Sequence, residues 1–213
     1  MLLSRIMPAN KIQELYRELR KKHGAPAGQW QLWCKRNKTK QEREEVIIGA
    51  ILTQNTNWRN VSKAIANLKK ARACSLSKIR RLGQYSRERT KLQEMIRPSG
   101  FYRVKAQYLV NIADYFFEIN GVSSAKKLKL AKIRKQLLAL KGVGRETADS
   151  ILNYALGKPI FIIDAYTKRL VKRLKLARKL DYEHLQHLFE DKIRRDHRLY
   201  QDFHALIVID AKN

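Results

Sequence analysis

Two glycines and one acid, close together in the sequence, are the residues whose types and spacing best suit chemistry. Gly142 and Gly144 interrupt a helical pattern, and a second helix is expected to begin directly after them. Glycine permits a tight turn, and the backbone N–H groups that open the second helix can bind an anion. Asp164 follows an apolar run twenty residues beyond Gly144. A phosphate-binding turn followed by one carboxylate in an apolar setting predicts an enzyme that acts on a nucleic-acid backbone or base.

The elements that must position these residues are predicted to be helices almost throughout. Apolar residues recur at helical spacing, and the expected helices span 11–22, 44–53, 57–71, 86–96, 101–119, 124–140, 164–174, 182–194 and 197–210. Ser86 is expected to cap its helix. The pattern predicts a loop over 25–40 and a short extended connector over 159–163. We therefore predict an all-α bundle of about ten helices.

Composition narrows the class of protein. Lysine and arginine number 46 against 19 acids among 213 residues, and the net charge of +27 favours a polyanionic partner. Cys34 and Cys74 are the only cysteines, so free thiols in a reducing cytoplasm are expected rather than a disulfide framework. No apolar run reaches the ~18 residues of a membrane span. The N-terminus lacks the pattern of a signal peptide.

Three blocks of sequence carry a resemblance to a known family. Lys-Gly-Val-Gly-Arg-Glu-Thr-Ala over 141–148, together with Asp164, resembles the helix–hairpin–helix DNA glycosylase superfamily, to which endonuclease III belongs. Ile-Gly-Ala-Ile-Leu-Thr-Gln-Asn-Thr over 48–56 resembles a second family block. Arg-Pro-Ser-Gly-Phe-Tyr over 97–102, with Lys105 and Ala106, resembles a third. The last two are most similar to 3-methyladenine DNA glycosylases.

The resemblance implies an all-α, two-lobed helical bundle with a DNA-binding cleft between the lobes. Residues 44–157 would form a helical barrel lobe that contains the helix–hairpin–helix motif at 137–156. Residues 1–43 and 158–213 would pair to form the terminal lobe. Asp164 and the hairpin would then face each other across the cleft.

Asp164 is the residue to which the resemblance assigns catalysis. Cleavage of an N-glycosidic bond builds positive charge on the sugar. A carboxylate held nearby stabilises that charge and can orient or deprotonate the attacking water. An aspartate directly before a helix is also a common N-cap, and the two roles can coexist.

Glu146 bears on whether the enzyme also cuts the DNA strand. Family members that cut the strand carry a lysine at this place, which attacks the sugar and forms a Schiff base. A carboxylate cannot form that imine, so the resemblance implies a monofunctional enzyme that leaves an abasic site. An acid in the first turn of a helix is also favoured by the helix dipole alone. The hairpin residues Gly142, Gly144 and Arg145 are expected to bind a DNA phosphate.

Four residues match family positions that either hold the flipped base or fill the gap that it leaves in the duplex. Gln54 matches the residue that fills the gap left by a flipped nucleotide, with a polar helix-end residue as the alternative. Trp58 and Trp33 match aromatic walls of the base pocket, where an indole face attracts a cationic alkylated purine. Core packing is the alternative for each tryptophan, and the segment around Trp33 departs from the family's Trp-Trp-Pro pattern. Lys212 matches a pocket lysine, with a terminal surface lysine as the alternative.

Cofactor predictions follow from the same residues. Two cysteines cannot ligate an iron–sulfur cluster, so none is expected. The carbonyls of Leu138, Leu140 and Val143 are the predicted ligands of a monovalent cation at the hairpin. His184 and His187 are three residues apart without an apparent third ligand, which argues against a metal site there. The basic run from Lys126 to Lys135, which includes Arg134, is interpreted as a solvated face or a phosphate contact.

The function predicted from the sequence is a monofunctional DNA glycosylase of base excision repair that flips and excises alkylated purines such as 3-methyladenine. One alternative is an endonuclease III-type bifunctional glycosylase and lyase for oxidised pyrimidines. The other is a non-catalytic helix–hairpin–helix DNA-binding protein. The expected partner is double-stranded DNA with a damaged base, bound by a monomer that does not associate with membranes. We expect a cytoplasmic, nucleoid-associated protein of a bacterium.

Overall fold

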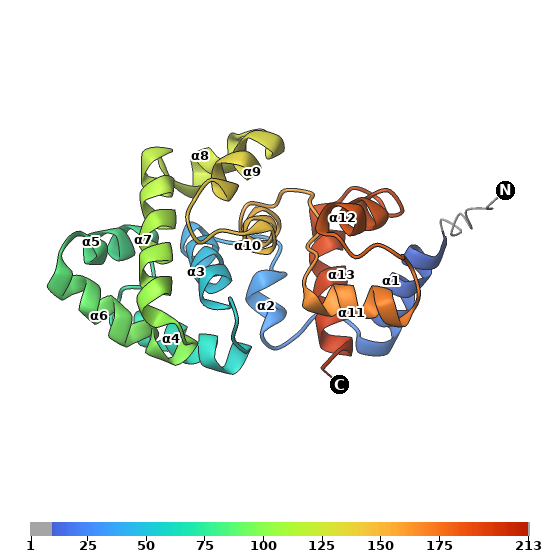
Figure 1. Ribbon diagram of the computed structural model, residues 1–213, viewed down its shortest axis with the longest axis horizontal. Coiled ribbons are helices and arrows are strands. Elements are labelled where there is room, and N and C mark those ends of the chain that lie inside the picture. The colour runs from blue at the N-terminus through green and yellow to red at the C-terminus, as the bar shows by residue number, and fades with distance from the viewer. Residues whose placement is uncertain (1–9, 213) are drawn as a thin grey trace. The chain divides into compact units, whose positions relative to one another are not determined.

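The computed structural model describes residues 10–212, and all regular secondary structure within them is helical (Figure 1). The predicted all-α class is therefore confirmed. The chain divides into two compact units. Of the described residues, the first unit contains 35–158, and the second combines 10–34 with 159–212.

Eight α-helices and two short irregular helices build the unit of residues 35–158. In chain order they are α3 (Lys40–Leu52), α4 (Trp58–Lys70), α5 (Leu76–Gln84), α6 (Ser86–Ile96), the 3-10 turn η1 (Arg97–Ser99), α7 (Tyr102–Glu118), α8 (Gly121–Lys127), α9 (Leu130–Leu138), α10 (Arg145–Ser150) and the π-helical turn η2 (Ile151–Ala155). Side-chain caps fix where several of them begin. Thr39 and Glu42 form a reciprocal capping box on α3. Asn57 caps α4 and Ser75 caps α5.

Helix α3 forms the centre of this unit. Val46, Ile47, Ile48, Ile51 and Leu52 are all completely buried. The second half of the helix is therefore apolar on every side, and such a segment must be surrounded by other elements. It packs against α4, α7, α8, α10 and η2. The run predicted as an apolar helix over 44–53 is thus the core of the unit.

A buried lysine fixes the C-terminal end of α3. Lys105 on α7 is 2% exposed, and its ammonium donates to the carbonyl of Leu52 at 2.8 Å and to that of Ser99 at 2.7 Å. Burial lowers the pKa of Lys105 to about 8. The side chain satisfies a carbonyl at the end of α3, where intrahelical partners run out. It thereby holds the turn that follows α3 against η1.

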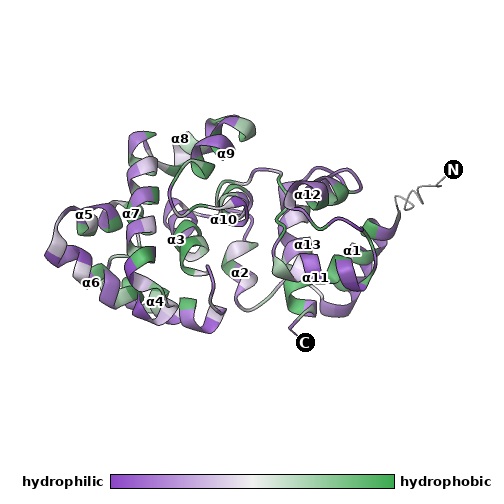
Figure 2. Ribbon diagram, viewed as in Figure 1, coloured by the Kyte–Doolittle hydropathy of each residue, from purple (hydrophilic) through white to green (hydrophobic). Residues whose placement is uncertain are grey.

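The second unit contains α1 (Asn10–His23), α2 (Trp30–Trp33), α11 (Ala165–Arg173), α12 (Tyr182–Glu190) and α13 (His197–Asp210). Helices α1 and α11 pack against α13, so segments from both halves of the sequence share one core (Figure 1). The centre of that core is an aromatic cluster. Phe161 stacks on Phe189 at 4.4 Å between centroids and meets Phe203 edge-on at 5.6 Å. Figure 2 shows hydrophobic and hydrophilic residues on different sides of individual helices, as amphipathic packing requires.

Several predicted element bounds are wrong. The single helix expected over 124–140 is two helices, α8 and α9, because the chain is extended at Leu128 and Lys129. The sequence reading missed α5, and the loop predicted over 25–40 contains α2. Ser86 is the first residue of α6 rather than its cap. Tyr85 occupies the cap position and makes no side-chain capping bond.

Candidate active site

The turn between α9 and α10 forms the predicted hairpin, and its two glycines play different parts. Gly142 has φ +94°, and a Cβ at this position would overlap the ring of Tyr108. Only glycine fits there. Gly144 has φ −83° with an extended backbone, and a Cβ there would meet no atom within 4 Å. The turn therefore requires glycine at Gly142, whereas at Gly144 the backbone conformation alone does not require it. Gly144 leaves open space where a ligand can approach the backbone.

The tip of the hairpin is exposed. Gly144 is the N-cap residue of α10 and has no capping side chain, and Arg145 and Glu146 follow it in the first turn. All three residues are exposed to solvent. The N–H groups that open a helix lack intrahelical acceptors and attract anions. Glu146 therefore lies on the exposed first turn beside the predicted phosphate-binding N–H groups.

Gln54 is attached to the hairpin. Its side-chain amide donates to the carbonyl of Gly142 at 2.8 Å and to the hydroxyl of Thr147 at 3.0 Å. The turn after α3 and the hairpin are consequently linked by a side chain that is partly exposed. For Gln54 to enter a DNA duplex, as predicted, these two hydrogen bonds must first break.

Asp164 lies in the other unit, at the start of α11. One carboxylate oxygen accepts the N–H of Thr167 at 2.7 Å, so the predicted N-cap is confirmed. The other oxygen lies 3.4 Å from Nε2 of His204 on α13. This separation is long for a hydrogen bond, so we treat the contact as electrostatic. Burial raises the pKa of Asp164, whereas the charge of His204 and the N–H of Thr167 lower it, and the net pKa lies below the usual value. Asp164 is thus an ionised carboxylate that is only 8% exposed.

Two tryptophans of α2 form an aromatic cluster with His204, the residue that faces this carboxylate. Trp30 meets the ring of His204 edge-on, with 5.8 Å between centroids, and meets Trp33 edge-on at 6.0 Å. Both indoles are 7% exposed. Trp33 is therefore a buried side chain, and its role as a wall of the base pocket stays a prediction. Trp58, at the start of α4 in the unit of residues 35–158, is partly exposed.

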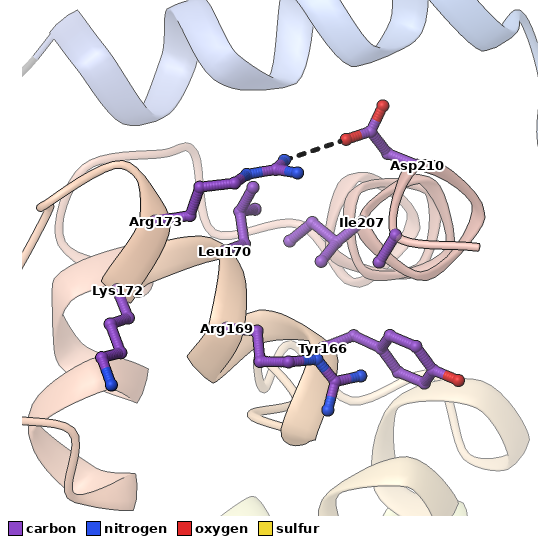
Figure 3. A pocket seen from close by; sticks show the side chains of 8 residues that line it. Tyr166, Arg169, Leu170, Lys172, Arg173, Ile207 and Asp210 are labelled. Carbon is purple, nitrogen blue, oxygen red and sulfur yellow. Dashed lines mark hydrogen bonds and ion pairs between the residues drawn. The ribbon is translucent and has the colours of Figure 1, made fainter. Parts of the chain in front are cut away.

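Lys212 lies close to the first turn of α11. Its ammonium is 5.6 Å from the centroid of the Tyr166 ring, two residues beyond Asp164, and Arg169 lies over the same ring at 4.5 Å. Tyr166 and Arg169 also line a cavity of about 550 Å³ between α11 and α13, across which Arg173 bonds to Asp210 (Figure 3). The predicted pocket lysine is exposed, but it adjoins the turn that carries the candidate acid.

Comparison with known proteins identifies the family. Residues 48–195 match the HhH-GPD superfamily of base excision DNA repair proteins. The chain belongs to the HhH-GPD superfamily. It is 42% identical over 177 residues to a Methanocaldococcus jannaschii protein named as a DNA repair glycosylase, covering 81% of this chain and 78% of that one. Its fold superposes on the H. pylori 3-methyladenine DNA glycosylase MagIII, crystallised with 1,N6-ethenoadenine. The TM-score is 0.76, the identity is 31%, and 96% of each chain is covered.

Endonuclease III shares the same fold. A trapped endonuclease III–DNA covalent intermediate superposes with a TM-score of 0.70 at 19% identity, covering 96% of this chain and 86% of that one. The endonuclease III of Thermotoga maritima is 29% identical over 140 residues, which are 65% of this chain and 60% of that protein. Together with the family match, these likenesses identify an HhH-GPD DNA glycosylase of base excision repair, as predicted.

The remaining expectations concern cofactors and location. Within residues 10–212, no three side chains of His, Cys, Asp or Glu lie together as a metal site. The carbonyl of Leu140, one of the predicted cation ligands, already accepts the N–H of Val143 at 3.1 Å. None of the described helices is long and apolar enough to span a membrane. The relatives include archaeal and bacterial proteins, so the bacterial source stays a prediction.

Two residues of this HhH-GPD site were not found from the sequence. His204 faces Asp164, and Trp30 supports the ring of His204. The available signal for His204 was a single imidazole in the otherwise apolar stretch of α13. Trp30 was assigned to a loop. Neither contact can be inferred from helical periodicity, because Asp164 and His204 are forty residues apart.

Proposed function

We propose that this HhH-GPD protein is a monofunctional DNA glycosylase that hydrolyses the N-glycosidic bond of alkylated purines such as 3-methyladenine. The observation that carries the proposal is Asp164, a buried and ionised carboxylate at the start of α11. A negative charge held in an apolar environment interacts more strongly with a cationic sugar than the same charge does in water. Asp164 would stabilise the sugar cation as the base departs and accept a proton from the attacking water.

Glu146 supports the monofunctional part of the proposal. It occupies the exposed first turn of α10, where bifunctional relatives carry the lysine that attacks the sugar. A carboxylate forms no Schiff base with an aldehyde, so the pathway through a covalent imine is closed at this position. The product would be an intact strand with an abasic site.

The preference for alkylated purines rests on charge. A cationic alkylated base is a good leaving group, so little help from a general acid is needed. An indole face attracts such a base by about 2 kcal/mol or more when water is excluded. We propose Trp58, which is partly exposed, as one wall of the base pocket, while the pocket roles of Trp33 and Lys212 stay predictions from the family resemblance. The 31% identity to MagIII, which was crystallised with an ethenoadenine, favours the same substrate class.

The hairpin supports DNA binding in this proposal. The N–H groups of Gly144 and Arg145 would bind one phosphate, and Gly142 would maintain the turn. Gln54 would leave its bonds to Gly142 and Thr147 and enter the space of the flipped base. A monovalent cation at Leu138, Leu140 and Val143 would have to share the carbonyl of Leu140 with the N–H of Val143.

Matched duplexes that carry 3-methyladenine or thymine glycol test the proposal. We expect faster release of 3-methyladenine, corrected for spontaneous loss, and no adduct trapped by borohydride. Trp58→Ala should reduce the preference by more than about tenfold, because the loss of about 2 kcal/mol of cation binding exceeds the roughly 1.4 kcal/mol that corresponds to a factor of ten. Tyr85→Ala, which removes an exposed aromatic ring of the same unit, serves as the control. A trapped adduct with faster release of thymine glycol would instead indicate the endonuclease III-type activity.

A further inference from the structure

We propose that His204 is the positioning residue of the site: it keeps the Asp164 carboxylate ionised and in place for base release. The inference rests on the catalytic role proposed for Asp164 and adds a second residue to it. His204 lies on α13 and is 5% exposed, and its Nε2 is 3.4 Å from the second carboxylate oxygen of Asp164. Nothing in the sequence pattern assigned this imidazole a role.

The need for such a residue follows from the burial of the carboxylate. Asp164 is 8% exposed, and removal from water disfavours the charged form of an acid. One backbone N–H, that of Thr167, bonds to a single oxygen of the carboxylate. The second oxygen faces the imidazole of His204. The N-cap bond stabilises only one of the two carboxylate oxygens. A cationic or N–H-donating ring beside the other oxygen offsets the remaining cost of burying the charge.

Packing holds the imidazole where this effect requires it. The ring of His204 meets the indole of Trp30 edge-on at 5.8 Å and an interplanar angle of 87°. Trp30 in turn meets Trp33 at 6.0 Å. Helix α11, which Asp164 caps, packs against α13, which carries His204. The distance between ring and carboxylate is thus set by two helices and an aromatic stack rather than by a mobile surface side chain.

The groups that act on Asp164 come from few elements. His204 on α13 is the titratable group that faces the carboxylate, and Thr167 is the polar group of α11 itself. Helix α2 contributes the ring of Trp30 behind His204. The hydroxyl of Tyr182 on α12 accepts the N–H of the residue before Asp164, at 3.4 Å. If replacement of His204 changes how the rate of base release falls at low pH, the change can therefore be assigned to loss of the imidazole.

His204→Phe in the full-length protein is the test. Phenylalanine keeps a ring against Trp30 and removes both the charge and the N–H group. The measurement is the single-turnover rate of base release across pH, corrected for spontaneous loss, together with DNA affinity. An opposite charge within about 4–6 Å lowers the pKa of an aspartate by about 1–3 units. We therefore expect the acid midpoint of the rate profile to rise by about one pH unit or more, while DNA affinity stays the same.

Matched variants separate this effect from a loss of structure. His204→Gln keeps a donor without a full charge and should move the midpoint in the same direction by less. His23→Phe removes another imidazole that contacts an aspartate in this unit, at 2.9 Å from Asp210, and should leave the midpoint unchanged. Acid midpoints of both His204 variants that coincide with the wild type would overturn the inference. If Asp164→Asn also keeps full activity, the proposed function itself fails. If Asp164→Asn is inactive, only the role of His204 fails.

Discussion

Two buried aspartates, one in each unit, show how differently this protein treats a negative charge. Asp149 on α10 is completely buried, and Arg134 on α9 binds it through two hydrogen bonds of 2.7 and 3.0 Å. Asp164 at the start of α11 is nearly as buried. It receives one backbone N–H at 2.7 Å and an imidazole at 3.4 Å. Both oxygens of the Asp149 carboxylate are bound by a permanent cation. Among the described residues, the Asp164 carboxylate has no permanent cation beside it, and one of its oxygens makes no contact shorter than the 3.4 Å contact with His204.

The difference fits a structural role for Asp149 and the catalytic role that we propose for Asp164. A guanidinium is always protonated, so the Arg134–Asp149 pair is neutral as a whole and fixes α9 against α10. The negative charge of such a carboxylate is largely neutralised, so it attracts a further cation only weakly. An imidazole is a weaker and more distant partner, so the charge of Asp164 can still attract another cation. A carboxylate that must stabilise a sugar cation needs that property.

The largest expected effect comes from making the same substitution, aspartate to asparagine, at both positions. Asp164→Asn should lower the rate of base release at least about 10²-fold, because the amide keeps the shape and the N-cap but not the charge. Asp149→Asn should keep a rate near that of the wild type. Single-turnover base release with saturating enzyme measures both. Asp181→Asn, at the N-cap of α12 in the same unit as Asp164, controls for capping. Equal rates of base release for Asp164→Asn and Asp149→Asn would contradict the different roles assigned to the two aspartates.

Stability should show the reverse order. Asp149→Asn leaves Arg134 facing an uncharged amide, and loss of one partner of a fully buried pair costs about 3–5 kcal/mol. Since the Arg134 side chain is 23% exposed, we expect a smaller loss of about 2 kcal/mol in the free energy of unfolding. Asp164→Asn should stay within about 0.5 kcal/mol, because asparagine caps helices as well as aspartate does. Urea unfolding at neutral pH measures both, and a larger loss for Asp164→Asn would contradict the assignment.

The two aspartates also show what the sequence can and cannot predict. Asp164 was predicted as both the N-cap of a helix and the candidate acid, because an acid before a helix and the spacing from the hairpin are local patterns. The cap is confirmed. Arg134 was interpreted as part of a solvated or phosphate-binding face, yet its side chain binds Asp149. Charge runs do not reveal which member finds a buried partner on the neighbouring helix.

The same limit applies to the elements. Strongly periodic helices such as α1 and α4 were predicted to within a residue or so, because their apolar faces repeat regularly. The helix expected over 124–140 is divided at Leu128 and Lys129, where neither glycine nor proline marks the break. The roles of Trp30 and His204 depend on contacts between distant segments. Such contacts are set by the packing of helices, which periodicity alone does not specify.

A third aspartate, Asp210, extends the comparison, and its replacement is expected to have the smallest effect on stability. Asp210 at the end of α13 contacts three cationic or titratable side chains: Lys22 at 2.7 Å, His23 at 2.9 Å and Arg173 at 3.2 Å, the last drawn in Figure 3. Partial burial raises the pKa of Asp210, but the hydrogen bonds from Lys22, His23 and Arg173 lower it more, to about 2. Asp210 thus has more partners than Asp164. The side chains of Lys22 and Arg173 are 63% and 61% exposed, whereas that of His23 is 9% exposed.

Asp210→Asn should cost less than about 1 kcal/mol at neutral pH, because its pairs with the two permanent cations, Lys22 and Arg173, involve exposed side chains and are screened by water and salt. The pKa of Asp210 is lower in the folded protein than in the unfolded chain, so its contribution to stability is present above about pH 4 and is lost as the pH falls toward 2. The variant and the wild type should consequently differ most near neutral pH and converge near pH 2. The difference should also shrink in high salt. Thermal unfolding across this pH range measures it. A loss as large as that of Asp149→Asn would show that the number of cationic partners, rather than their burial, determines how much a carboxylate stabilises this fold.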